Sequence, residues 1–200
     1  MRYGMVIDLE KCWGCQSCTV ACEAENFVPP GVFFNRVLVE EIGKYPSAKM
    51  QFVPVQCNHC VDAACVKVCP TGATRKEEDG IVTIDPNKCI GCRYCIVACP
   101  YRIRFFLSKK ETYTPDASPH EQMGSRARDY QEGTVIKCDF CADKVRQGLE
   151  PACVSTCVGR ARFFGDLDDP TSEVSRLIAT RGGTQLLVEK GTDPSIFYLR

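Results

Sequence analysis

Residues 89–100 have the sequence CIGCRYCIVACP, and the organisation of the whole chain follows from this run. Cys89, Cys92 and Cys95 are separated by two residues each, and Cys99 follows after three more, directly before Pro100. This is the ligand spacing of bacterial ferredoxins, in which three thiolates on a tight loop hold one [4Fe–4S] cluster. The fourth cysteine ligates the other cluster of a pair, so such runs act two at a time.

A partner run precedes this motif at residues 57–70 and also ends in Cys-Pro. Between the two runs, a turn signal at residues 77–80 leads into the strand-like segment 81–85, as in a ferredoxin hairpin. Exchange of the last cysteine of each run predicts two ligand sets, which are Cys57, Cys60, Cys65 and Cys99 for one cluster and Cys69, Cys89, Cys92 and Cys95 for another.

Two further groups of four cysteines flank the central pair, and neither is followed by proline. Because they lie toward opposite ends of the chain, their pairing would enclose the central unit and bring the two terminal regions together. The eleven residues between Cys141 and Cys153 depart from the ferredoxin spacing. The same exchange predicts the remaining sets, which are Cys12, Cys15, Cys18 and Cys157, and Cys22, Cys138, Cys141 and Cys153.

Strand-like segments before and after the cysteine groups predict an α+β fold. The expected unit is a strand, a cysteine loop, a short helix that carries the last cysteine, and a second strand. We predict two interlocked bacterial-ferredoxin-like units, an outer one over residues 1–50 and 134–168 and an inner one over residues 51–107. The expected strands are Tyr3–Asp8, Phe52–Gln56, Ile81–Asp85, Arg102–Leu107, Thr134–Lys137 and Ala161–Gly165, and the expected helices include Ser17–Ala24 and Ile96–Cys99.

Two segments between the cysteine groups lie outside this repeat. Residues 31–42 alternate apolar and polar side chains, which predicts a hairpin arm. Residues 108–133 are polar and contain two prolines. For this long connection, a solvent-exposed loop and a partner-binding loop are both open interpretations.

Residues 169–200 are expected to form a C-terminal helix and an extended docking tail. Asp169-Pro170 is typical of a helix start, and the helix should run to about Thr180 and end at Gly182-Gly183. Thr184–Val188 and Ile196–Leu199 are expected to be extended and to pack against a neighbour.

Composition gives independent limits on the class of protein. Cysteine accounts for 16 of 200 residues, a level at which metal sites usually supplement a thin core, so we expect the clusters to contribute to folding. Lys plus Arg and Asp plus Glu are equal at 25 each, which does not indicate nucleic acid binding. Residues 1–8 have no features of an export signal, and no apolar stretch approaches the roughly 20 residues of a membrane helix.

Other uses of the cysteines fit the spacing less well. The fourth group alone resembles a zinc ribbon, but runs of three cysteines with two-residue gaps are poor zinc ligands. A disulfide scaffold needs a secretory context, of which the sequence shows no sign. Structural zinc and disulfides are therefore the minor alternatives.

The sequence contains no catalytic constellation. It has no Ser/His/Asp or Cys/His set and no glycine-rich phosphate loop, and of its two histidines His120 lies in the polar segment. His59 lies between Cys57 and Cys60, where we expect it to hydrogen-bond near a cluster or to a partner. Because sixteen cysteines would fill every iron of four clusters, we expect no enzyme activity of the chain by itself.

Lysine directly precedes the first cysteine of three groups, as Lys11, Lys88 and Lys137. One hypothesis is that these charges raise cluster potentials, which depend on net charge and hydrogen bonding. Exposed solubilising lysines are the alternative. Trp13, the only tryptophan, either shields the Cys12 cluster or marks a docking surface.

Over nearly its whole length the chain resembles the four-cluster iron–sulfur subunits of dimethyl sulfoxide reductase-family molybdopterin oxidoreductases. The resemblance rests on residues 3–22, 57–60, 65–73, 89–95, 151–153 and 165–170. Within that family the chain is similar to the polysulfide, thiosulfate and arsenate reductase branch. It implies sixteen cysteine ligands for four [4Fe–4S] clusters. It also implies relay of electrons between a quinone-reactive membrane subunit and a molybdenum or tungsten bis-pterin catalytic subunit, in anaerobic respiration.

Such subunits are commonly exported while bound to a catalytic partner, so the resemblance implies the outer, periplasmic face of the cytoplasmic membrane, with the cytoplasm as alternative. Two other functions stay open. One is a free polyferredoxin, which would not need the arm, the loop or the tail. The other is the β-subunit of a formate dehydrogenase or hydrogenase-type complex. The substrate, the direction of electron flow and the cluster potentials do not follow from the sequence.

Overall fold

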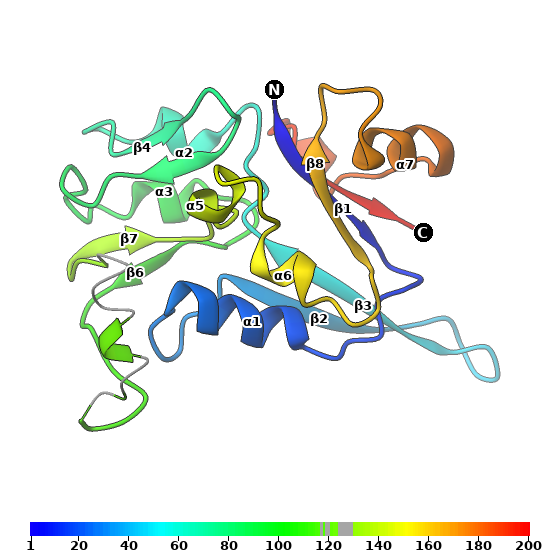
Figure 1. The fold of residues 1–200 in the computed structure, drawn as a ribbon, viewed down its shortest axis with the longest axis horizontal. Coiled ribbons are helices and arrows are strands. Elements are labelled where there is room, and N and C mark those ends of the chain that lie inside the picture. The colour runs from blue at the N-terminus through cyan, green and yellow to red at the C-terminus, as the bar shows by residue number, and fades with distance from the viewer. Residues whose placement is uncertain (117, 119–120, 124–129) are drawn as a thin grey trace.

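The computed structural model describes residues 1–116, 118, 121–123 and 130–200, and Figure 1 shows their arrangement. Within these residues the strands form one three-stranded sheet and three two-stranded sheets, connected by short helices. The mixed composition agrees with the predicted α+β class. The division into an outer and an inner unit stays a prediction.

The three-stranded sheet joins the two terminal regions of the chain. Its central strand β1 (Tyr3–Asp8) pairs antiparallel with β8 (Arg162–Asp166) and parallel with β9 (Ile196–Leu199). Residues 5–7 are completely buried, because neighbouring elements cover both faces of β1. The pairing of β1 with β8, which Figure 1 shows side by side, fixes the segment before the first cysteine group to the segment after the last.

A long hairpin extends from the lower right of the molecule in Figure 1. It consists of β2 (Asn35–Ile42) and β3 (Lys49–Gln56), paired in register along their whole length. The prediction of a hairpin arm is confirmed for residues 35–42, which form the first strand, and the second strand contains the predicted strand Phe52–Gln56. The turn comes later, at Gly43 (φ +89°), where Ser47 N–H donates to the Lys44 carbonyl over 2.7 Å.

Two small hairpins organise the central cysteine groups. One pairs β4 (Thr74–Lys76) with β5 (Val82–Ile84) around the predicted turn at residues 77–80. The other pairs β6 (Phe105–Leu107) with β7 (Thr134–Ile136), which ties the end of the third cysteine group to the start of the fourth. The observed β5, β6 and β7 each lie within the segment predicted for them.

Short helices follow the cysteine loops, but they carry fewer of the last cysteines than predicted. They are α1 (Ser17–Asn26), α2 (Ala64–Lys67), α3 (Tyr94–Val97), α5 (Ala142–Val145) and α6 (Ala152–Ser155). Cys22 lies inside α1, whereas Cys69, Cys99 and Cys157 each come two residues after a helix end. Proline follows Cys69 and Cys99, and the residue before a proline avoids helical backbone.

The C-terminal helix α7 (Glu173–Arg181) begins later than predicted. Its N-cap is Ser172, whose hydroxyl accepts from the Ser175 N–H over 3.3 Å. Asp169 instead accepts from the Thr171 N–H over 2.8 Å in a preceding turn. The helix ends as predicted at Gly182, which has a left-handed backbone.

The tail after α7 packs on its own chain, so the prediction of a tail docked on a neighbour is wrong for β9. Ile196 and Leu199 are completely buried in the terminal sheet. The segment expected to be extended after α7 forms an isolated bridge between Thr184 and Tyr198, followed by the 3₁₀ turn η1 (Val188–Lys190). Burial of this tail against β1 removes more apolar surface from water than an exposed strand would.

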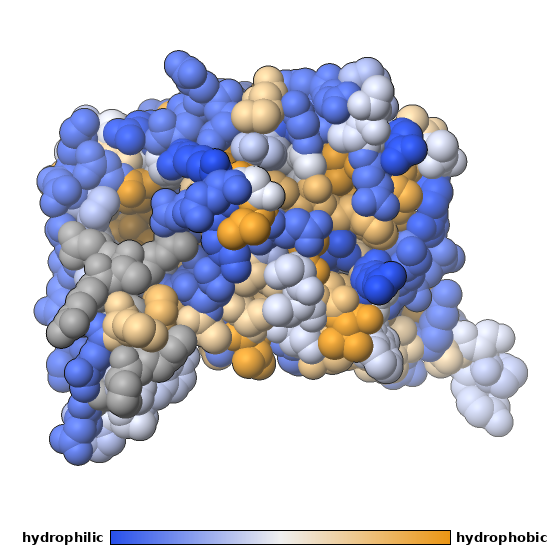
Figure 2. Space-filling view, in the orientation of Figure 1, coloured by the Kyte–Doolittle hydropathy of each residue, from blue (hydrophilic) through white to orange (hydrophobic). Residues whose placement is uncertain are grey.

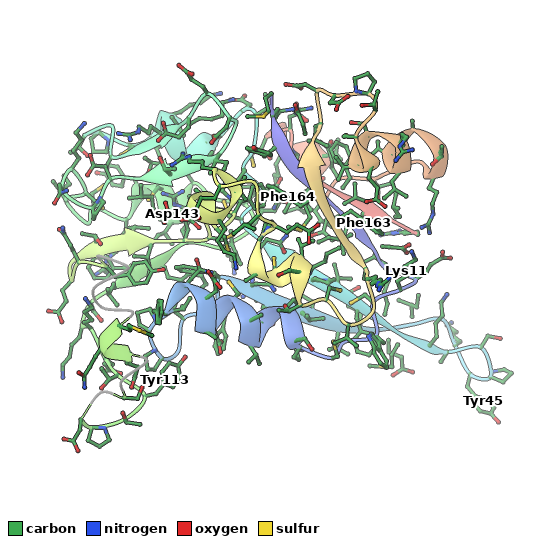
Figure 3. All side chains as sticks on the ribbon, in the orientation of Figure 1. Lys11, Tyr45, Tyr113, Asp143, Phe163 and Phe164 are labelled. Carbon is green, nitrogen blue, oxygen red and sulfur yellow. The ribbon has the colours of Figure 1, made fainter. Side chains whose placement is uncertain are left out.

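The main hydrophobic core lies between the terminal sheet and the cysteine loops. It contains Met5 and Ile7 of β1, Tyr198 of β9, Ile81 before β5, and Phe140 from the fourth cysteine group. Figure 3 shows Phe164 of β8 pointing to this interior. The loops with the cysteines are thus anchored by core side chains.

Candidate metal centres

A small cavity between the first cysteine loop and the segment after α6 is lined by four cysteines. Gly14 has φ +75°, and a Cβ there would meet the Phe52 ring of β3 at 2.4 Å. Only glycine lets this loop lie against β3. We call the cavity site I; its cysteines are Cys12, Cys15, Cys18 and Cys157.

A second cavity lies between the loop before α2 and the chain after α3. Its wall includes His59, Tyr101 and Arg104. The Tyr101 hydroxyl lies 2.7 Å from the Thr192 hydroxyl, which holds the C-terminal segment over the cavity. We call it site II; its cysteines are Cys57, Cys60, Cys65 and Cys99.

A third cavity lies between the chain before β4 and the loop before α3. In this loop Gly91 has φ +67°, and a Cβ would meet the Gly133 carbonyl at 2.1 Å. The loop therefore presses on the turn before β7, and glycine is required. We call it site III; its cysteines are Cys69, Cys89, Cys92 and Cys95.

The remaining four cysteines meet in the interior, between α1, α6 and the loop before α5. The Asn26 amide Nδ2 lies 3.6 Å from the Cys22 Sγ and 3.5 Å from the Cys141 Sγ. Burial raises the pKa of Cys153 to about 11, and Cys141 is among its electrostatic neighbours. We call this group site IV; its cysteines are Cys22, Cys138, Cys141 and Cys153.

In each site the structure brings together the four cysteines that exchange of the last cysteine predicts. The exchanged residues are Cys99 in site II and Cys69 in site III, and likewise Cys157 in site I and Cys22 in site IV. The eleven-residue gap in the fourth group does not prevent this grouping. The role of the cysteines as iron ligands stays a prediction.

Backbone N–H groups point at several of the sulfur atoms. The donors are Thr74 to Cys69 over 3.3 Å, Val135 to Cys89 over 3.5 Å, Phe140 to Cys138 over 3.4 Å and Ala161 to Cys157 over 3.2 Å. Such donors suit a sulfur that acts as acceptor, as a metal-bound thiolate does. Four thiols per site with N–H donors fit an iron–sulfur cluster.

Burial favours the protonated form of several of the free thiols. It raises the pKa of Cys60 to about 12, with the thiols around it as further cause. Because iron binds thiolate, loading of such a site must release protons, and the binding free energy of the metal must exceed this cost. Metal binding and folding of these loops are therefore coupled.

The four sites are consecutive in the order I, IV, II, III. Helix α1 carries Cys18 of site I and Cys22 of site IV one turn apart. The ring of Phe140, between two site IV cysteines, stacks on His59 of site II with centroids 3.8 Å apart. Arg104 connects sites II and III, because its charge acts on cysteines of both. Neighbouring sites thus share elements or side chains.

Of the two histidines, only His59 lies in the described part of the chain. His59 is buried, so it is not a partner contact; its Nδ1 accepts from the Val82 N–H over 2.9 Å. His59 lines the site II wall, and its Nε2 has no hydrogen-bond partner among the described residues. Burial, with the charges of Lys137 and Arg104, holds the pKa of His59 well below its usual value. His120 lies outside the described residues.

The three lysines that precede cysteine groups are not equivalent. The side chains of Lys11 and Lys88 are about half exposed, with Lys11 Nζ 5.3 Å from the Phe163 ring centroid beside it in Figure 3. Lys137 is buried, and its ammonium donates to the carbonyls of Val82 and Cys138. Trp13 is 61% exposed, so it forms part of the surface at site I. The alternative of solubilising lysines is wrong for Lys137.

Two buried arginines at the sites were not predicted from the sequence. Arg104 and Arg162 are each 4% exposed, although arginine is mostly a surface residue. The available signal was a repeat, Cys-x2-Arg-x-Arg-Phe-Phe, at residues 99–106 and 157–164. In both copies the first arginine is exposed with positive φ and the second is buried.

Comparison with known proteins agrees with this geometry. A family described as 4Fe–4S dicluster domain matches residues 48–115 and 116–167, and a second family of that description matches residues 11–73. The matches to two dicluster families and the sixteen cysteines support four [4Fe–4S] clusters. In the described part of the chain, no helix has the length and apolar character needed to span a bilayer.

Iron–sulfur subunits of several reductases are similar over nearly the full chain. A Halobacterium salinarum protein described as the iron–sulfur subunit of a dimethyl sulfoxide reductase is 48% identical, covering 99% of this chain and 79% of that protein. The matching subunit of the selenate reductase of Mesobacillus selenatarsenatis is 47% identical, covering 100% and 72%. The arsenate respiratory reductase iron–sulfur subunit of a Shewanella species is 40% identical, covering 100% and 97%.

Proposed function

Because the chain belongs to the family of iron–sulfur subunits of dimethyl sulfoxide, selenate, arsenate and tetrathionate reductase-type molybdoenzymes, we propose that it relays electrons between a bis-pterin catalytic subunit and a quinone-reactive membrane subunit. Membership of this family gives the general role of the chain, which is that of an electron-transfer subunit and not of a catalytic one. The ligands in this proposal are the sixteen cysteines in the sets of sites I to IV.

The observation that carries the proposal is the order of the sites. Sites IV and II lie in the middle of the series and sites I and III at its ends. Cys15 of site I and Cys92 of site III are exposed, whereas no cysteine of site IV or site II is exposed. When bound, the clusters would supply reversible one-electron chemistry at each site. A series with accessible ends and a protected middle suits a relay between two partners.

The surface supports contact with other subunits. Beside site III, Ile90, Tyr94 and Val97 are exposed, with Val97 at 86%. Figure 2 shows apolar side chains over α1 and α6 on the face in view. Val20 of α1 is among the exposed apolar residues. Apolar surface of this kind is typical of protein interaction sites. The catalytic partner is supported by the relatives' subunit names, and the membrane partner is part of the proposal.

We further propose a location at the outer face of the cytoplasmic membrane, reached by export with the catalytic subunit. The substrate class in this proposal is a sulfur compound or oxyanion, such as polysulfide, thiosulfate or arsenate, since relatives are named for arsenate and tetrathionate reductases. A free polyferredoxin and a formate dehydrogenase or hydrogenase subunit are less well supported, because the relatives are subunits of other reductases.

Anaerobic isolation of the tagged chain from native extract tests the proposal. The expected result is a brown complex that contains a large pterin-binding subunit and a full complement of iron for four clusters on this chain. Variants Cys15→Ser and Cys92→Ser should each disturb one terminal cluster in EPR spectra. A brown protein that elutes alone at the mass of one chain would contradict the relay, and zinc in place of iron would contradict the clusters.

A further inference from the structure

Each of the two copies of the Cys-x2-Arg-x-Arg-Phe-Phe repeat places one arginine in the interior. In the first copy this residue is Arg104, five positions after Cys99, and in the second it is Arg162, five positions after Cys157. Both cysteines are the ones exchanged between paired sites. The arginines therefore occupy equivalent positions in the site II and III pair and in the site I and IV pair.

Arg104 lies between sites II and III. Its Nη2 donates to the Thr74 hydroxyl over 2.8 Å, while Nε and Nη1 are buried with no partner among the described residues. It lines the wall of site II. Burial lowers the pKa of Arg104, but Cys65 and Cys57 of site II and Cys95 of site III raise it, with a net rise. Arg104, with two donor nitrogens that have no hydrogen-bond partner among the described residues, thus lines a site that contains four cysteines.

Arg162 lies between sites I and IV in the same way. Its Nη2 donates to Asn35 Oδ1 over 2.8 Å and lies 3.5 Å from the Cys18 Sγ of site I, and its Nη1 donates to Gln56 Oε1 over 3.3 Å. Cys153 of site IV is also an electrostatic neighbour that raises the pKa of Arg162. The guanidinium therefore faces both sites of its pair.

Neither arginine forms an ion pair with a carboxylate among the described residues. A buried cation without a counter-charge costs several kcal/mol, so a buried arginine requires negative charge nearby. A cluster held by four thiolates supplies such charge, and two clusters flank each arginine. The arginine in turn favours the reduced form of each cluster, which carries one more negative charge.

We propose that Arg104 and Arg162 are positioning residues, each shared by the two clusters of its pair, and that each raises the reduction potentials of both. This inference rests on the proposed four-cluster function. It assigns one buried cation to each pair of sites, and so predicts that potentials change two at a time.

The test is potentiometric EPR of the anaerobically purified full chain with Arg104→Gln and Arg162→Gln. Glutamine keeps polar N–H donors but removes the charge. Arg104→Gln should lower two of the four midpoints, and Arg162→Gln should lower the other two. The expected effect is at least tenfold in the ratio of reduced to oxidised cluster at fixed potential, equivalent to about 59 mV for one electron.

The repeat supplies matched controls. Arg102 and Arg160 occupy the exposed position of each copy. Arg102→Gln and Arg160→Gln therefore delete the same positive charge at a solvent-exposed position. Solvent screens such charges, and these variants should leave all four midpoints unchanged. Arg104→Lys and Arg162→Lys keep the charge and should leave the midpoints close to those of the unchanged chain.

Three results would overturn the inference: unchanged midpoints in both buried variants, the same two midpoints lowered in both, or equal shifts in the exposed controls. If a glutamine variant loses clusters, the lysine variant at the same position tests the role of the charge. A lysine variant that also lacks the clusters, or that has changed midpoints, would refute this role. Iron analysis of the unchanged chain separates the two claims, since a chain without four clusters refutes the proposed function itself.

Discussion

The imidazole of His59 stacks on the ring of Phe140 with centroids 3.8 Å apart and an interplanar angle of 27°. His59 lies in the loop of site II and Phe140 in the loop of site IV, so this stack is a contact between the two pairs of sites. Phe140 also meets Phe164 of β8 edge-on at 5.3 Å. The rings therefore fix the separation of the middle sites and join it to the terminal sheet.

Phe140→Ala should destabilise the protein strongly. The ring is 1% exposed and belongs to the main core, so its removal leaves a cavity at the junction of sites II and IV. Phenylalanine-to-alanine changes at such positions cost about 3–5 kcal/mol. The measurement is the urea midpoint of anaerobic unfolding, followed by circular dichroism.

Tyr45→Ala is the matched control for Phe140→Ala, since Tyr45 is 95% exposed at the turn of the β2–β3 hairpin. Its loss should change the free energy of unfolding by less than about 0.5 kcal/mol. Equal destabilisation by both variants would show that the stacked contact has no special weight in the fold.

The grouping of the cysteines could be predicted from the sequence for two reasons. Three ligands of a ferredoxin run lie close together in the sequence, and the exchange of the last cysteine between paired runs fixes the fourth ligand. Strand β1 and helix α1 were predictable for a similar reason, since their patterns are local. The pairing of β9 with β1 depends on contacts between segments at opposite ends of the chain, which no local pattern specifies.

The buried arginines show the same limit within the site. Arg102 and Arg104 are the same residue type two positions apart, yet only Arg104 is buried. The positive φ of Arg102 (+51°) sets the direction in which the chain enters β6, and that direction decides which side chain faces the cysteines. Composition and spacing do not contain this information, although the second copy of the repeat does indicate a common role.

Gly91→Ala should disrupt site III. The added Cβ would meet the Gly133 carbonyl at 2.1 Å, so the loop must move away from the turn before β7. Displacement of the loop moves Cys89 and Cys92 relative to the other two ligands. The expected result is loss of one of the four clusters, which would be measured as a decrease of the iron per chain by one quarter.

Gly72→Ala separates this steric effect from backbone strain. Gly72 has nearly the same φ, +66°, but a Cβ there would meet nothing within 4 Å. We expect all clusters to bind and a cost of about 1–2 kcal/mol from the left-handed backbone alone. Retention of full iron by Gly91→Ala would contradict the close packing of the site III loop.

Arg181→Ala should loosen α7 from the terminal sheet. The guanidinium pairs with the Asp8 carboxylate, whose side chain is 1% exposed, and also donates to Glu10 over 2.9 Å. Removal leaves Lys11, whose Nζ lies 4.0 Å from the Asp8 carboxylate, as the remaining cation at Asp8, so we expect a lower free energy of unfolding. Limited proteolysis at residues 182–184 should accelerate, whereas Arg176→Ala, on the exposed face of the same helix, should not change it.

Lys137→Gln should lower at least one midpoint potential, because Lys137 lies at the junction of sites II and IV. Its charge acts on His59 and on Cys65 of site II, and it directly precedes Cys138 of site IV. In a buried position this charge is little screened, so a tenfold change in the ratio of reduced to oxidised cluster, about 59 mV, is expected. Lys88→Gln removes a lysine in the same place relative to a cysteine group, but that side chain is 58% exposed and should cause less than a twofold change. Redox-titrated EPR of both variants tests whether the burial of a lysine or its position before a cysteine group determines its effect on the midpoint potentials. A larger shift for Lys88→Gln would contradict the role of burial.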